Sequence, residues 1–244
     1  MHASRPVVRG PVFASFHRDL AAPISRMARL CRTLGLGVLL VAMPVQADDG
    51  SETAPEAKVN TASLFYVQVY RDKGRLLSGA AHDHVVRAED FKAVLRFSPA
   101  EPRTCEFQLS APVHSLAVDE PEMRKRVGYE GVLDPDDRKE VKEHMLADDQ
   151  LDAKRHKTID VIARNCRPAK APDTYSVDLA LTVRGKTKRL SKDVVIKVEA
   201  GSVSTRGSLR LRHADFGMEP YSAFLGAVKN AEELDFVWAL RAKL

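Results

Sequence analysis

The sequence lacks most of the short motifs that carry catalysis. It contains no glycine-rich phosphate loop, no nucleophile elbow and no HExxH zinc motif. It is also poor in aromatic residues, with one Trp and five Tyr among 244 residues. An outer-membrane barrel needs aromatic girdles and an apolar outer surface, whereas the polar positions here carry charges such as Lys92, Arg96, Asp178, Lys197 and Arg210. These absences disfavour the common enzyme classes and a membrane-spanning barrel.

An excess of charge is also missing once the N-terminal segment is set aside. The chain has 38 Lys and Arg against 33 Asp and Glu, a net charge of +5. Residues 1–47 hold six arginines and one aspartate, so residues 48–244 contain 32 basic and 32 acidic residues. A basic chain is a candidate for nucleic-acid binding. Here the basicity belongs to the N-terminal segment, so no nucleic-acid partner is expected.

The N-terminal segment has the pattern of an export signal. Arg26, Arg29 and Arg32 precede the apolar run Leu34–Val45, and Val45-Gln46-Ala47 is a small-residue cleavage site. The run is too short to span a bilayer comfortably, and no second one follows it in the sequence. The pattern predicts a cleaved signal peptide, with an uncleaved membrane anchor as the alternative.

These signals predict the boundaries of the mature protein. Met27 would open a compact leader and is the expected true start, and cleavage after Ala47 would release a periplasmic protein. Residues 48–62 are acidic and aperiodic, which predicts a disordered tether. One folded domain is therefore expected over residues 63–244.

The longest regular pattern lies between Thr174 and Ala200. Apolar side chains occupy every second position from Tyr175 to Val183, and after a polar break a second apolar series runs from Leu190 to Val198. A period of two is that of a strand with one apolar face. The stretch therefore predicts a long β-hairpin with a glycine-containing turn.

The same alternation predicts further strands. They are residues 64–70, 75–86 with a kink at Gly79, 91–97, 105–113, 158–166, 203–213 and 234–240. Eight or nine half-apolar strands joined mainly by short turns favour an all-β fold. We predict an antiparallel up-and-down barrel of about eight strands, with a sandwich as the alternative.

Two densely charged segments have a helical period instead. In residues 119–131 and 134–147 the sparse apolar residues recur at helical spacing, and Asp134 is followed by Pro135 as an N-cap would be. One or two short helices are expected within this long connection. Either they form a lid over an opening, or they are a solvated crossover.

Several segments occur in an order that resembles a known family. They are HDHVV with FKAVLRFSP, then LDAKRHKTIDV, LTVRGKTKRL, the turn HADFG, and LGAVK before the last strand. Together they make residues 82–244 similar to the YceI-type lipid-binding domain. Two departures are that Arg155-His156-Lys157 lacks the family's usual proline and that the charged stretch 119–149 is longer than typical. The resemblance implies a lipocalin-like barrel whose lumen holds a long polyisoprenoid.

A lumen that holds an isoprenoid needs apolar walls. The candidate ligand-binding residues are the inward alternates Phe91, Leu95, Phe97, Phe107, Leu109, Val177, Leu179, Leu181, Leu209, Leu211, Phe236 and Trp238. A closed, packed core is the alternative. The expected ligand is an isoprenoid quinone or a polyprenyl phosphate, with no other cofactor. Exchange at a membrane surface and homodimerisation are left open, as are carrying, storage and sensing.

His82 and His84 are a second candidate site. In a strand they would project to one face and could supply two metal ligands, with a third from His114, His213 or a carboxylate. The resemblance implies no catalytic metal. We therefore expect these histidines to hydrogen-bond loops at the barrel mouth. No enzyme activity is expected, although a metal-dependent enzyme or an envelope interaction module is the alternative.

The cysteines predict a disulfide. Cys31 would leave with the leader, so the exported chain would keep only Cys105 and Cys166. An even pair in an oxidising compartment favours a bond. Antiparallel pairing with Cys105 opposite Cys166 would set Leu109 opposite Ile162. A slip of one residue would put the sulfurs on opposite faces, and two buried free thiols are then the alternative.

Overall fold

In the computed structural model, residues 56–60 and 62–243 are described. The expected start at Met27, the expected cleavage after Ala47 and residues 48–55 of the expected tether lie outside them. No helix in the described ranges is long and apolar enough to cross a membrane.

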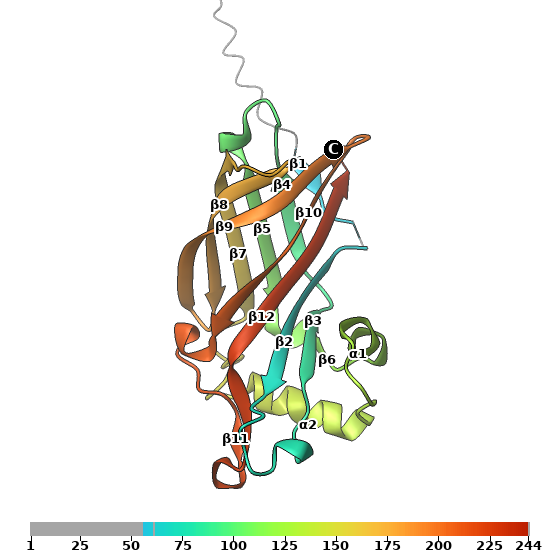
Figure 1. The fold of residues 1–244 in the computed structure, drawn as a ribbon, viewed down its shortest axis with the longest axis vertical. Helices are drawn as coiled ribbons and strands as arrows, with labels where there is room; N and C mark the ends of the chain where they lie inside the picture. The colour runs from blue at the N-terminus through green and yellow to red at the C-terminus, as the bar shows by residue number, and fades with distance from the viewer. Residues whose placement is uncertain (1–55, 61, 244) are drawn as a thin grey trace, which may run out of the picture. The chain divides into compact units, whose positions relative to one another are not determined.

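The predicted antiparallel all-β fold is confirmed (Figure 1). Within the described residues, one sheet of twelve strands has the order β1-β4-β5-β7-β8-β9-β10-β12-β2-β3-β6, and β11 pairs with β12. The strands are β1 Glu56–Lys58, β2 Leu64–Arg71, β3 His84–Ala88, β4 Lys92–Arg96, β5 Glu106–Pro112, β6 Leu116–Val118, β7 Thr158–Pro168, β8 Thr174–Val183, β9 Lys186–Glu199, β10 Ser202–Arg212, β11 Ser222–Ala223 and β12 Val228–Lys243. The count exceeds the predicted eight or nine because β1, β6 and β11, with two or three residues each, are too short to show alternation.

Contacts at both edges of the sheet join it into a barrel around a common core. Beyond β1, Val59 bridges to Ala242 of β12, and Asn60 N donates to Arg241 O at 2.8 Å. At the other edge, β5 continues through the short 3-10 helix Val113–Ser115 directly into β6. Glu56–Lys58 thus form an edge strand, and Val59 and Asn60 are bonded to β12, at the end of the expected tether over residues 48–62.

The central hairpin forms as the alternation predicts. β8 and β9 pair from Thr174↔Val195 to Val183↔Lys186, leaving Arg184 and Gly185 as a two-residue turn. Both turn residues have positive φ, 49° and 70°, the combination that matches the twist of two paired strands. A Cβ on Gly185 would lie 2.7 Å from the His156 ring, so this turn needs glycine for space as well as for φ.

The charged connection forms two α-helices, α1 Pro121–Val127 and α2 Pro135–Leu146. Asp134 caps α2 as predicted, because its Oδ1 accepts hydrogen bonds from the backbone N–H of Asp136 and Asp137, both at 2.9 Å. The remaining helices are short 3-10 turns: Ser78–Ala80, Pro102–Thr104, Val113–Ser115, His213–Phe216 and Phe224–Gly226.

The predicted strand over residues 75–86 is wrong in its first part. Only His84–Ala88 is a strand, and Ser78–Ala80 is a 3-10 helix. The loop is fastened to the end of β2 by Asp83, whose carboxylate accepts a hydrogen bond from Arg71 N at 2.8 Å. Leu76 and Leu77, which looked like inward residues of a strand, are 91% and 45% exposed at the tip of this loop.

Cys105 and Cys166 are joined by a disulfide with a Cα–Cα distance of 5.8 Å, but not through the predicted register. In the β5–β7 pair Leu109 lies opposite Val161 instead of Ile162, the one-residue slip that should separate the sulfurs. A β-bulge in β7 compensates. Asn165 has φ 57°, and the β7–β8 register shifts between Arg164 and Arg167. The extra residue returns Cys166 to the buried side.

Candidate ligand-binding cavity

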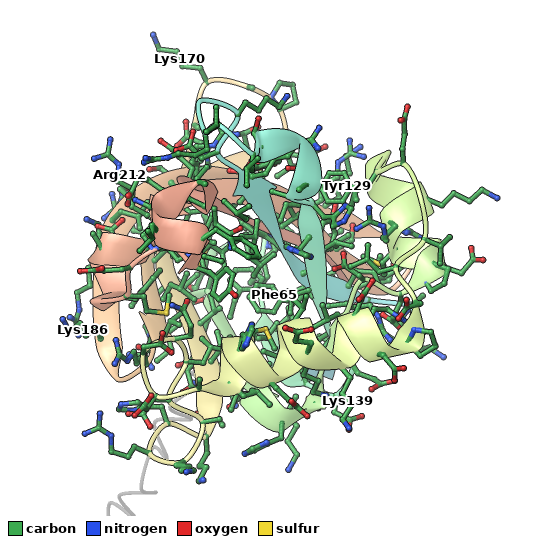
Figure 2. All side chains as sticks on the ribbon, turned by 90° about the horizontal axis from the view of Figure 1, so that it is seen from below. Phe65, Tyr129, Lys139, Lys170, Lys186 and Arg212 are labelled. Carbon is green, nitrogen blue, oxygen red and sulfur yellow. A yellow bond between two sulfur atoms is a disulfide. The ribbon has the colours of Figure 1, made fainter. Side chains whose placement is uncertain are left out.

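The barrel interior contains two neighbouring cavities of about 170 Å³ and about 70 Å³. Phe65 of β2 and Phe236 of β12 line both of them and are each 4% exposed. Figure 2 looks into the barrel from the end crossed by α2 and shows Phe65 near the middle of the interior. These two rings therefore lie at the boundary between the cavities. We call the larger cavity the polar chamber and the smaller one the apolar chamber.

The apolar chamber is built from the alternating residues of the long strands. It is lined by Phe65, Leu95, Phe107, Gln108, Leu109, Val161, Ala163, Val177, Leu179, Leu181, Val194, Thr205, Leu209, Phe236, Trp238 and Leu240. Successive inward positions of β8 supply three of these side chains because the side-chain period of a strand is two. With only an amide, a hydroxyl and an indole N–H as polar groups among sixteen side chains, the chamber suits a hydrocarbon.

Trp238, the only tryptophan of the chain, is placed in this chamber by a glycine on the neighbouring strand. Gly207 of β10 lies opposite Trp238 of β12, and a Cβ on Gly207 would lie 2.4 Å from the indole ring. The indole N–H also points to Thr205 Oγ1 at 3.4 Å. The missing side chain at position 207 leaves the space that the indole ring occupies beside Gly207.

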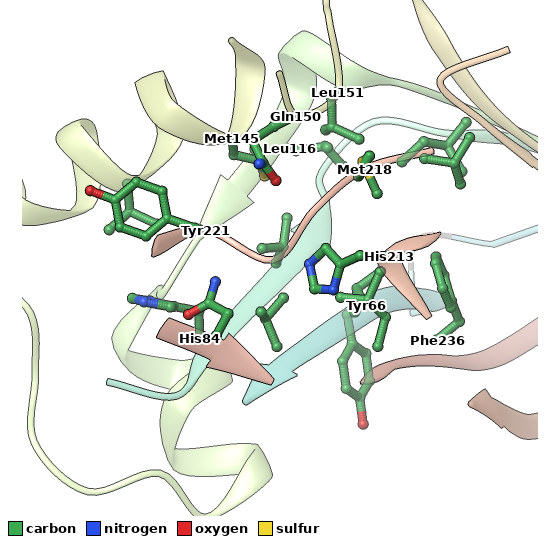
Figure 3. Close-up of a pocket in the computed structure, with 18 of the residues that line it drawn as sticks. Tyr66, His84, Leu116, Met145, Gln150, Leu151, His213, Met218, Tyr221 and Phe236 are labelled. Atoms are coloured by element: carbon green, nitrogen blue, oxygen red, sulfur yellow. The ribbon is translucent and has the colours of Figure 1, made fainter. Parts of the chain in front are cut away.

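The polar chamber lies between the strand ends and α2 (Figure 3). It is lined by Phe65, Tyr66, Val67, Val69, His84, Val86, Ala88, Leu116, Val141, His144, Met145, Gln150, Leu151, Ile159, Val183, His213, Met218, Tyr221, Asn230, Leu234 and Phe236. Val141, His144 and Met145 belong to α2, so this helix covers one end of the interior. The arrangement corresponds to the lid alternative and not to the solvated crossover.

One side of the polar chamber rests on a buried charge network. His84 Nδ1 lies 2.6 Å from Asp119 Oδ2, and Asp119 Oδ1 accepts from Val85 N at 3.0 Å and from Arg124 at 2.9 Å. Asp119 is fully buried and Arg124 is 3% exposed. Burial acts to raise the pKa of Asp119, but the hydrogen bonds from His84, Val85 and Arg124 outweigh it and hold that pKa below its ordinary value.

Arg124 also donates hydrogen bonds to the backbone of the surrounding loops. Its guanidinium donates to the carbonyl oxygens of Asp83, Glu130 and Gly131 at 2.8 to 3.0 Å. Its charge is thus committed to Asp119 and to backbone, and Arg124 does not line either chamber. Asp119 itself has φ 48°, an unusual conformation for a residue other than glycine. The hydrogen bonds of its carboxylate with His84, Val85 and Arg124 maintain this conformation.

Two other imidazoles face the polar chamber. His213 is 4% exposed, and its Nδ1 donates to Glu232 O at 3.1 Å, which leaves Nε2 as an acceptor in the neutral ring. Burial lowers the pKa of His213, so the neutral form is favoured. His144 of α2 stacks on Tyr221 with ring centroids 5.0 Å apart. No Lys or Arg side chain is among the lining residues of the polar chamber.

The structure brings together most of the residues chosen from the sequence. Nine of the twelve predicted wall residues line the apolar chamber, and Phe236 and His84 line the polar one. Phe97 and Leu211 are buried in the core, Phe91 packs against it, and none of these three lines a chamber.

The histidines do not have the arrangement that the metal-site alternative requires. His82 is exposed and precedes β3, which begins at His84, so the two side chains share no strand face. Among the described residues no group of three or more His, Cys, Asp or Glu is placed to hold a metal ion. His84 has a carboxylate partner instead, and the sequence offered no signal for it because Asp119 lies 35 residues away.

The sequence reasoning missed most of the polar chamber. Its walls come from β2 and β3, from α2, and from the loop residues Gln150, Met218 and Tyr221. Residues of a loop follow no period, so no alternation could select them. The apolar spacing of Val141 and Met145 was the one usable signal, since it indicated a helix with one side packed on the barrel.

Comparison with known proteins gives a consistent result. A family model for the YceI-like domain matches residues 68–240. The fold is similar to that of BcnA from Burkholderia cenocepacia, with a TM-score of 0.54 and 18% identity over 74% of this chain and 96% of that one. A polyisoprenoid-binding domain from Saccharophagus degradans has a TM-score of 0.50 and 11% identity over 77% of this chain and 97% of that one. Among curated proteins, none matches this chain significantly.

Proposed function

The chain belongs to the YceI-like family, and from that premise we propose that it is a periplasmic carrier of one isoprenoid lipid. The tail would lie in the apolar chamber and the head group in the polar chamber. The observation that carries the proposal is the division of one interior into an apolar part and a part lined by imidazole, amide and phenol groups. The polyisoprenoid-binding domain of similar fold supports it.

The driving force for the tail would be burial of apolar surface, about 25 cal/mol per Å². The two chambers are small, about 170 Å³ and about 70 Å³, beside the roughly 300–1,000 Å³ of typical ligand pockets. A long tail would therefore have to displace the Phe65 and Phe236 rings and join the chambers. Movement of α2 would provide the way in, since this helix has no fully buried residue holding it down.

The lining of the polar chamber favours a neutral head group. A phosphate or diphosphate buried there would have no Lys or Arg beside it, and an unpaired buried anion is costly. Arg124, which is linked to the lining residue His84 through Asp119, is already paired with that carboxylate at 2.9 Å. Imidazole, amide and phenol groups suit carbonyl and hydroxyl oxygens, so an isoprenoid quinone is preferred to a polyprenyl phosphate.

The disulfide supports the periplasmic part of the proposal. A disulfide between Cys105 and Cys166 persists in an oxidising compartment such as the periplasm. Sequencing the N-terminus of the protein isolated from its native host should give Asp48 as the first residue. A product that still carries residues 34–45 would contradict cleavage after Ala47.

The ligand itself can be tested by extraction and by titration. Organic extracts of protein purified from its native envelope should contain an isoprenoid quinone by mass spectrometry. Titration with that quinone should quench the fluorescence of Trp238, which lines the apolar chamber. A polyprenyl phosphate of equal tail length should bind at least about tenfold more weakly, a difference of about 1.4 kcal/mol.

The control for the titration uses one charge at two positions. Leu209→Glu places it in the apolar chamber and should abolish quenching, whereas Ile162→Glu places it on β7 at a 38% exposed site and should not. Binding of the polyprenyl phosphate as tight as that of the quinone would contradict the preference for a neutral head group. Extracts without any isoprenoid, together with no quenching, would contradict the carrier function.

A further inference from the structure

Two loops meet at the end of the barrel that α2 covers. They are residues 72–83 between β2 and β3 and residues 221–229 around β11, and both are visible at the lower end of Figure 1. Leu77 N donates to Ala227 O at 3.0 Å, and Asp72 N donates to Lys229 O at 2.8 Å. Backbone hydrogen bonds therefore hold the two loops as one unit.

This unit presents four large apolar side chains to solvent. Leu76 is 91% exposed, Leu77 45%, Phe224 76% and Leu225 fully exposed. We call these four residues the apolar tip. Only Val132, Ile162 and Val198 are further large hydrophobic residues exposed in the part of the chain that the structure describes. Single exposed hydrophobic residues are ordinary, but four on two adjoining loops mark an interaction site.

The backbone holds half of this tip in an unfavourable conformation. Phe224 has φ 50° and Leu225 has φ 55°, and Gly226 follows with φ 88°. Bulky side chains rarely adopt the left-handed region, and such strain clusters where a segment has a function. Here it turns the side chains of Phe224 and Leu225 into solvent at the end of a tight loop. These side chains therefore contribute no hydrophobic burial to the stability of the fold.

The tip adjoins the polar chamber. Tyr221 and Asn230, which line that chamber, are the residues on either side of the 222–229 turn, and Asn230 N donates to Tyr221 O at 2.9 Å. A ligand leaving the chamber beside Tyr221 would therefore emerge next to the tip.

The two loops carry a small excess of positive charge. Residues 72–83 and 221–229 contain Lys73, Arg75 and Lys229 against Asp72 and Asp83. Arg75 is paired with the neighbouring Asp72 at 2.7 Å, and Lys229 lies 3.5 Å from Glu232. Cations beside protruding apolar side chains match the surface of a bilayer that contains anionic lipids.

We infer that the apolar tip is a membrane-docking device that seats this end of the barrel in the interface of an anionic bilayer. Four side chains that protrude from two turns can enter a fluid interface without a complementary pocket, whereas a folded protein would have to provide one. The docking would bring the polar chamber to the lipid surface. That purpose rests on the proposed function, but the docking can be measured without any ligand.

The test is sedimentation of the purified protein with vesicles of phosphatidylglycerol and phosphatidylethanolamine. The wild-type protein should bind, and the variant with Leu76, Leu77, Phe224 and Leu225 all changed to Ser should bind at least about tenfold more weakly. Changing Lys73 alone to Gln should weaken binding less, by about fivefold, and this loss should appear only at low salt. Binding to vesicles of phosphatidylcholine alone should be weaker for all variants.

The control removes exposed hydrophobic residues elsewhere. Ile162→Ser with Val198→Ser changes two sites that are each 38% exposed, outside the tip, and should leave vesicle binding unchanged. The tip is exposed, so its variants should fold, and circular dichroism verifies this. Equal vesicle binding by the wild type and the tip variant would overturn the inference. Loss of a protein partner by the tip variant, without any vesicle binding by the wild type, would also overturn it.

A second measurement separates this inference from the carrier function. The tip variant should quench Trp238 fluorescence like the wild type when quinone is supplied in detergent, but should extract quinone from vesicles more slowly. Normal quenching with normal vesicle extraction would contradict the docking role alone. No quenching in either protein would contradict the carrier function, while leaving vesicle binding as the independent measure of docking.

Discussion

The two chambers of this barrel share the side chains Phe65 and Phe236 but are built in different ways. The apolar chamber is made by long, regular strands whose inward residues repeat every second position. The polar chamber is made by strand ends, one helix and loops, and it depends on hydrogen bonds between residues far apart in the chain. The difference shows that a regular sheet can enclose an apolar cavity through local periodicity alone, whereas the polar groups at its irregular end are placed by contacts between distant segments.

The largest effect that tests this difference is a buried charge placed in each chamber. Leu179→Glu in the apolar chamber should lower the free energy of unfolding by about 3–5 kcal/mol, because no basic side chain lines that chamber to pair with the charge. Met145→Glu, on α2 at the polar chamber, should cost much less, because that side chain is only partly buried and can turn toward solvent. Urea unfolding of both variants measures the contrast, and equal losses would contradict it.

Removing the disulfide should have the next largest effect. Cys105 and Cys166 close a loop across β5 and β7, whose residues Phe107, Val161 and Ala163 line the apolar chamber. Replacing both cysteines with Ala should cost about 2–4 kcal/mol of unfolding free energy. Thiol counting on denatured, unreduced protein lacking the leader should find no free thiol, and two titratable thiols would show that no bond forms.

The smallest effect concerns the charge network of the polar chamber and is expected to depend on pH. The pKa of Asp119 is below its ordinary value in the folded protein, so its stabilising contribution is complete above about pH 4 and is lost as the pH falls through the folded-state pKa. Asp119→Asn should cost about 2 kcal/mol at pH 7, because His84 and Arg124 lose their charged partner. The variant should lose less stability than the wild type on acidification below pH 4.

The control for this prediction is a carboxylate with a similar pKa direction on the outside of the barrel. Asp178 pairs with Arg167, which lowers the pKa of that carboxyl to about 2, but Asp178 is solvent-exposed. Asp178→Asn should therefore change the unfolding free energy at pH 7 much less than Asp119→Asn does. Equal effects of the two variants would show that the buried network has no special role in the polar chamber.

Much of the fold could be predicted from local patterns. The alternation in residues 174–183 and 203–213 predicted the strands and their inward faces, and Asp134 with Pro135 predicted the start of α2. Each of these features depends on residues that lie close together in the sequence, within two helical turns or a few strand positions. Nine of the twelve predicted wall residues line the apolar chamber for the same reason, because every second residue of a strand points to the same face.

Register and loops could not be predicted in this manner. The bulge at Asn165 reverses which face Cys166 occupies, and a one-residue insertion in a ladder has no signature in an alternating sequence. Leu76 and Leu77 have the same composition as inward strand residues, yet the loop that contains them is held outside by Asp83 and Ala227.

The sequence by itself determined the strand periodicity, the helix cap, the apolar character of the lumen and the resemblance to a lipid-binding family. Each of these depends on short segments of neighbouring residues. Only the tertiary structure decided that Phe65 and Phe236 divide the lumen, that Asp119 joins His84 to Arg124, and that two distant turns form one apolar tip. The physical reason is that each of these arrangements depends on contacts between segments distant in the chain. Such contacts exist only after the sheet has closed and brought the segments together.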